Sequence, residues 1–180
     1  MALEQAFDDL CQRLHEAYAY FHDVRLTVTD AEEGADTKAL VEGVAQELGD
    51  LMDNLDQARR AGERGRRALR QRPPSIEEAG RGLSQVQDLY WEASRRYADE
   101  LVAHYKVDQL RDLAQRNPRF APWSETVIGG LEGGRPAMHE TARSLHACWS
   151  EALERALTSG VAVYAVGQQI GMEALRNELG

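Results

Sequence analysis

The chain has 180 residues, of which 43% are hydrophobic and 28% charged, with a formal net charge of −9. This balance is typical of one globular domain and excludes a disordered or membrane-embedded chain, since no apolar run approaches the ~20 residues of a membrane span. The acidic total disfavours a dedicated nucleic-acid binder, although a local basic patch is compatible with it.

The N-terminal segment and the cysteines indicate the cellular compartment of the protein. Residues 1–18 carry acidic side chains and lack a basic n-region and a small-residue cleavage site, so no secretory signal is expected. The two cysteines, Cys11 and Cys148, are too few for a disulfide framework. Arginine supplies all cationic residues except Lys38 and Lys106, which hints at a GC-rich genome. We therefore expect a cytoplasmic, bacterial protein with free thiols.

Heptad spacing of apolar residues predicts four long helices, at about 2–28, 37–71, 76–116 and 123–157. Turn formers at 29–36 separate the first two. The seam of the first helix advances in alternating steps of four and three: Leu3, Phe7, Leu10, Leu14, Ala17, Phe21, Val24 and Val28.

A proline pair separates the second and third helices. Pro73 and Pro74 end the second helix, and Ser75 with Glu78 forms a capping box for the third. We expect the third helix either to continue to its end or to bend at Asp108. The seam of the second helix, weak toward its end, is Leu40, Val44, Leu48, Leu51, Leu55, Ala58, Gly62, Gly65 and Leu69.

The segment 123–157 contains four glycines and Pro136, which ordinarily indicate a loop. The apolar residues nevertheless keep the same helical spacing across these glycines and Pro136. We therefore favour one helix kinked at Pro136 over a loop, with the glycines allowing a neighbouring helix to approach closely. The stripe that keeps its phase is Trp123, Val127, Leu131, Met138, Ala142, Leu145, Trp149 and Leu153.

These helices predict an all-α fold. Because short connections favour antiparallel neighbours, we expect residues 1–158 to form an elongated antiparallel four-helix bundle of the coiled-coil type. Residues 159–180 are expected to form an extended C-terminal docking tail that can adopt a β-strand.

No motif typical of catalysis or metal binding is present. Glu-x-x-His, His-x-x-x-His and Cys-x-x-Cys are all absent. Gly-x-Ser-x-Gly is also absent, and GGLEGG at 129–134 lacks the strand and the Lys-Ser or Lys-Thr of a phosphate loop. We predict a non-enzymatic protein that holds no metal and no cofactor.

A weaker constellation involves histidines. His15 and His22 are seven residues apart, as are His139 and His146, so each pair shares a helix face. Together with the two cysteines they leave a small metal- or ligand-binding bundle as an alternative. The favoured interpretation is that the histidines flank the seam half-exposed and that the cysteines are small buried apolar residues.

Residues 59–72, RRAGERGRRALRQR, hold seven arginines and one glutamate. The run carries a formal charge of +6. Because the whole chain carries −9, the rest of the chain carries −15. Because guanidinium groups bind phosphate and carboxylate, one interpretation is a patch for nucleic acid or an acidic partner. We favour a solvated helix end paired with neighbouring acids, since no interleaved aromatics support nucleic-acid binding. The candidate patch is Arg59, Arg60, Arg64, Arg66, Arg67 and Arg70.

The segment 161–166, VAVYAV, differs from the preceding helices because it is rich in β-branched and aromatic residues, which favour extended structure. A helical bundle offers no sheet edge, so we expect the tail to dock on another protomer or on a partner protein. The alternative is that it continues the helix or packs along its own bundle. The candidate docking residues are Val161, Val163, Tyr164, Val166, Gln168, Gln169 and Ile170.

The leading functional hypothesis is a helical adaptor or assembly subunit that binds a partner protein through a bundle face and the tail. Self-association, as a homo-oligomer or within a hetero-complex, is expected because the seams are long and the tail is apolar. Membrane binding is not expected. The alternatives are an accessory nucleic-acid-binding subunit that uses 59–72 and the metal- or ligand-binding bundle.

Overall fold

The computed structural model describes residues 3–30, 35–103 and 106–158, and every regular element in these ranges is helical. The predicted all-α class is therefore confirmed for these residues. No helix among them is long and apolar enough to cross a membrane. The candidate docking tail at 159–180 lies outside the described residues. The elements are α1 (Leu3–Thr29), α2 (Ala35–Leu69), α3 (Ile76–Arg95), the π-helical η1 (Arg96–Ala103), α4 (Lys106–Arg116), the 3₁₀ turn η2 (Pro118–Phe120), α5 (Ala121–Gly133) and α6 (Arg135–Thr158).

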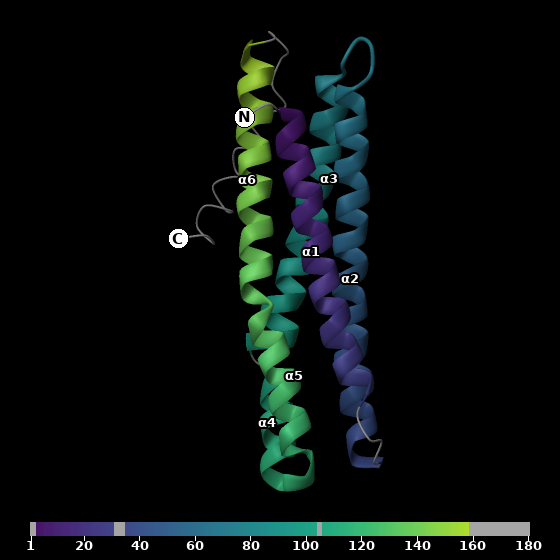
Figure 1. Ribbon diagram of the computed structural model, residues 1–180, viewed down its shortest axis with the longest axis vertical. Coiled ribbons are helices and arrows are strands. Elements are labelled where there is room, and N and C mark those ends of the chain that lie inside the picture. The colour runs from purple at the N-terminus through teal and green to yellow at the C-terminus, as the bar shows by residue number, and fades with distance from the viewer. Residues whose placement is uncertain (1–2, 31–34, 104–105, 159–180) are drawn as a thin grey trace.

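The helices form a bundle in which long elements lie side by side (Figure 1). α1 contacts both α2 and α6, and α2 also contacts α3. An ion pair joins Asp8 in the first turns of α1 to Arg66 near the end of α2. The Tyr90 hydroxyl of α3 donates a 2.7 Å hydrogen bond to the carbonyl of Met138 in α6. Helices distant in sequence are therefore joined by polar contacts as well as by the core.

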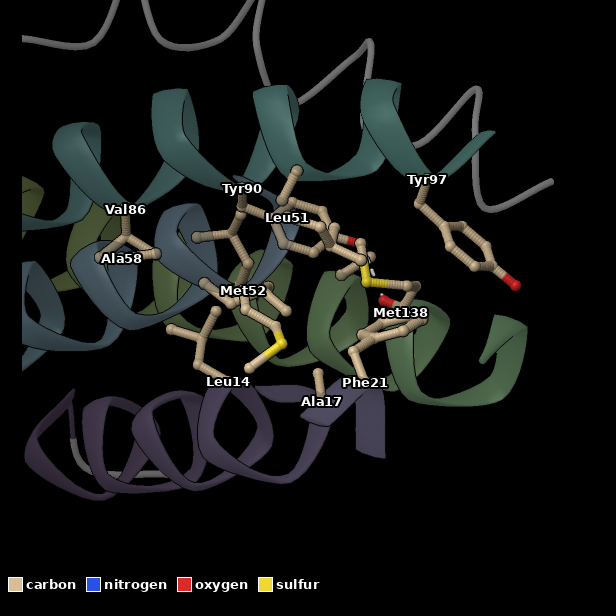
Figure 2. Close-up of a cluster of buried hydrophobic side chains, with 14 of the residues drawn as sticks. Leu14, Ala17, Phe21, Leu51, Met52, Ala58, Val86, Tyr90, Tyr97 and Met138 are labelled. Atoms are coloured by element: carbon tan, nitrogen blue, oxygen red, sulfur yellow. Dashed lines mark hydrogen bonds between the residues drawn. The ribbon is translucent and has the colours of Figure 1, made fainter. Parts of the chain in front are cut away.

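The core is built from the apolar seams. All eight residues of the predicted first seam, from Leu3 to Val28, are buried. The same holds for Val44, Leu48 and Leu51 of the second seam. Figure 2 shows side chains of α1, α2, α3 and α6 meeting in a common interior. Heptad spacing locates this core because it keeps one stripe of each helix turned to the same side.

The third predicted helix, 76–116, is interrupted. Ser75 caps α3 by accepting a 3.2 Å hydrogen bond from the backbone N–H of Glu78. The α-helical geometry ends at Arg95, where η1 follows, and Asp108 lies in the first turn of α4. A π turn is wider than an α turn and changes the phase of the residues that follow. In α4 the buried residues are Val107 and Leu110.

The fourth predicted helix, 123–157, is divided at Gly134, two residues before the expected kink. Pro136 lies in the first turn of α6, where its missing N–H is not needed. A Cβ atom on Gly134 would lie 2.6 Å from the ring of Phe21. The expected close approach of a neighbouring helix is thus observed, and it occurs where the chain bends.

Tyrosine hydroxyls stabilise this bend. Tyr20 of α1 donates a 2.8 Å hydrogen bond to the carbonyl of Gly130, and Tyr97 of η1 donates one of 2.8 Å to the carbonyl of Leu131. Both carbonyls lie within four residues of Gly134, where the helical hydrogen-bond ladder is interrupted. The bend therefore depends on side chains that come from two other elements.

Candidate surface for protein binding

The arginine run of α2 is divided between two sides of the helix. Arg66 pairs with Asp8 and Arg70 with Glu4 across the interface with α1. The hydrogen bond that Arg66 donates to Asp8 raises the pKa of the Arg66 guanidinium. These two arginines are used in packing α2 against α1, as expected for a helix end that pairs with neighbouring acids.

Arg59 is also neutralised, within its own helix. Its guanidinium lies 2.8 Å from Asp56 and 2.5 Å from Glu63. The hydrogen bond to Asp56 raises the pKa of Arg59, and the same hydrogen bond lowers the pKa of the Asp56 carboxyl. Four of the six candidate patch residues are thus paired with carboxylates: Arg59, Arg60, Arg66 and Arg70.

Three of the patch residues, Arg60, Arg64 and Arg67, lie on the solvent side of α2, and we call them the arginine face. Arg60 contacts Asp56 at 2.6 Å, yet its side chain is 64% exposed. Arg64 donates a 2.9 Å hydrogen bond to the side-chain oxygen of Gln85 in α3. Within the described ranges, neither Arg64 nor Arg67 forms an ion pair with a carboxylate. The arginine face therefore keeps exposed positive charge beside α3.

A second surface feature lies on α3 and η1. It is an open groove of about 480 Å³ on the side of α3 that faces away from the core. We call it the Trp91 groove, because the half-buried indole of Trp91 is its largest side chain. Its lining residues are Asp88, Trp91, Glu92, Ser94, Arg95, Ala98 and Asp99.

The Trp91 groove is acidic. Arg95 forms a 2.8 Å salt bridge with Glu92, and this contact lowers the pKa of the Glu92 carboxyl. Asp88 and Asp99 form no salt bridge within the described part of the chain, and both are exposed. The groove therefore combines an aromatic surface with two carboxylates that are open to a cationic partner.

Sequence reasoning did not single out Trp91. The available signal was a stripe of charged and aromatic residues on α3, at 88, 91, 92, 95 and 99, on the side opposite the apolar seam. A tryptophan within such a stripe differs from one within the seam, where burial alone explains it.

The cysteines are buried thiols. Burial raises the pKa of Cys11 to about 11 and also raises the pKa of Cys148 above its ordinary range. The histidines of the two seven-residue pairs, His15, His22, His139 and His146, are exposed or half-exposed. In the ranges that the structure describes, no group of three or more His, Cys, Asp or Glu side chains is arranged to hold a metal ion.

We expect both thiols to react slowly with a disulfide reagent in the native protein at pH 8. The thiolate is the reactive form, and Cys148 has no exposed surface, so its reaction requires opening of the bundle. Labelling should be roughly a thousandfold slower than in denaturant, a ratio set by the opening free energy. Cys11→Ser and Cys148→Ser assign each rate to one thiol, and rapid labelling of native Cys148 would contradict its burial.

Comparison with known protein families, with characterised proteins and with solved structures finds no match to this chain.

Proposed function

We propose that the protein is a non-enzymatic helical adaptor or assembly subunit that binds a partner protein through the face of α3 carrying the Trp91 groove. The observation that carries this proposal is a half-buried tryptophan in an open groove, on the side of α3 opposite its buried residues. Tryptophan is enriched among the residues that dominate binding energy, where a large flat ring meets a partner at low entropic cost.

The bundle supports this role by presenting the groove on a rigid element. The opposite side of α3 is anchored by Val86, Tyr90 and Ala93, all buried. A fixed α3 surface limits the ordering cost of association.

We further propose that the bundle is an antiparallel four-helix bundle of the coiled-coil type and that it acts in the cytoplasm. The tail at 159–180 is proposed to supply a second contact with the partner.

One observation favours a second candidate function. Arg64 and Arg67 have no carboxylate partner within the described ranges, so they are available to phosphate groups as an accessory nucleic-acid contact. In that case binding of a fluorescent single-stranded oligonucleotide should weaken steeply with salt, and Arg64→Glu with Arg67→Glu should abolish it. The acidic Trp91 groove beside them weighs against this candidate.

The test of the proposed function is affinity capture from the native host, read by mass spectrometry. The Trp91→Ala variant should fail to capture a partner protein that the wild-type full-length chain captures. Leu26→Ala, an exposed leucine of α1, is the matched control and should retain it, since Leu26 is 52% exposed and lies on another helix.

A chain that ends at Thr158 reports separately on the tail. Loss of the partner from this shorter chain alone assigns binding to the tail. Equal capture by the full-length chain and Trp91→Ala contradicts the role of the groove.

A further inference from the structure

We propose that the partner seated in the Trp91 groove is a second copy of this chain, which docks its arginine face there. The inference rests on the proposed function, because it uses the same groove and names its occupant. It gives the arginine face and the acidic groove a common role, as the two halves of one interface.

Charge complementarity is the first argument. The groove offers the exposed carboxylates of Asp88 and Asp99, while the arginine face offers Arg64 and Arg67 without carboxylate partners in the described ranges. Each surface leaves unneutralised charge that is opposite in sign to that of the other. Their contact removes both imbalances and steers the two copies into register.

The chemistry of the side chains is the second argument. A guanidinium group stacks on an indole ring and at the same time donates paired hydrogen bonds to a carboxylate. Trp91 lies in the groove with Asp88 three residues before it and Asp99 eight residues after it, so one surface offers both interactions. Arg60, Arg64 and Arg67 follow a spacing of four and three, which aligns them on one side of α2.

The position of the two surfaces is the third argument. The hydrogen bond between Arg64 and Gln85 holds the arginine face against α3, three residues before Asp88 begins the groove. The arginine face therefore lies beside the part of α3 at which the groove begins. Two copies related by a two-fold axis can each place the arginine face in the groove of the other, which closes the assembly as a dimer.

The experiment uses the full-length chain and sedimentation velocity over a range of concentrations. We expect the wild-type chain to dimerise at ~50 mM salt and to dissociate at ~500 mM, because the Debye length shortens roughly threefold over that range. Trp91→Ala should weaken dimerisation at least ~tenfold, as expected for an interface anchor. Arg143→Glu with Arg155→Glu, two exposed arginines of α6, is the charge-matched control and should dimerise normally.

Charge reversal on each surface, measured in the same sedimentation experiment, tests whether the two surfaces contact each other. One variant carries Arg64→Glu and Arg67→Glu, and the other carries Asp88→Arg and Asp99→Arg. Each alone should be monomeric, because like charges then face each other, whereas an equimolar mixture should dimerise with both contacts restored. All four positions are exposed, and circular dichroism verifies that each variant is folded.

Two results overturn the inference. The first is a wild-type chain that stays monomeric at low salt, and the second is a dimer that the paired reversals leave unchanged. Trp91-dependent capture of a different host protein by a monomeric chain would refute the second copy as occupant while leaving the proposed function intact. Loss of both the dimer and all Trp91-dependent capture would refute both.

Discussion

Replacing Gly82 with alanine should lower the free energy of unfolding by about 2–3 kcal/mol, the cost of forcing an extra methyl group into a packed interface. A Cβ atom at this position would lie 2.9 Å from the Cα of Gly65, 3.0 Å from its N and 3.1 Å from the carbonyl oxygen of Ala61. These are backbone atoms, so no side-chain rotation relieves the contact and α2 must separate from α3. Chemical denaturation followed by circular dichroism measures the change.

Gly80→Ala is the matched control for Gly82→Ala. Gly80 lies in the same helix, two residues earlier, and no atom lies within 4 Å of a Cβ added there. Alanine at position 80 should therefore stabilise the protein by roughly 0.5–1 kcal/mol, the helix-propensity gain over glycine. Equal effects of the two substitutions would contradict the close approach of α2 and α3.

Phe21→Ala should destabilise the protein by about 3–5 kcal/mol, because it opens a cavity in a fully buried site. The Phe21 ring centroid lies 5.4 Å from that of Tyr97 and 5.5 Å from that of Tyr20, so the truncation also removes two aromatic contacts. Leu26→Ala, on the exposed side of the same helix, should stay within ~0.5 kcal/mol of wild type.

The double variant makes this prediction specific to the bend. Gly134→Ala alone should cost ~1–3 kcal/mol, since its methyl group would meet the Phe21 ring. In the Phe21→Ala background that methyl group enters the vacated space, so the same substitution should become neutral or stabilising. Additive free energies in this double-mutant cycle would show that Phe21 and Gly134 are not in contact.

The candidate site was predicted only in part. The sequence identified the arginine run and the pairing of its arginines with neighbouring acids, an arrangement observed for Arg66 and Arg70. It did not divide the run, because the division depends on where α1 and α3 lie around α2. The Trp91 groove was missed for a related reason: among the described residues, no helix other than α3 and η1 lines this side of α3, and the local sequence pattern does not reveal that.

Local periodicity by itself determined the helical class and the buried side of α1, because a repeat of four and three places Leu3 through Val28 on one stripe whatever packs against it. The glycines of the segment 123–157 likewise predicted that a neighbouring helix approaches closely, since a residue without a side chain leaves room for it. Only the tertiary structure decided that the bend falls at Gly134, that η1 changes the phase before α4, and that Arg64 and Arg67 have no carboxylate partner in the described ranges. Each of these depends on contacts between residues far apart in the chain, such as Phe21 with Gly134 and Tyr97 with Leu131, which no local repeat specifies.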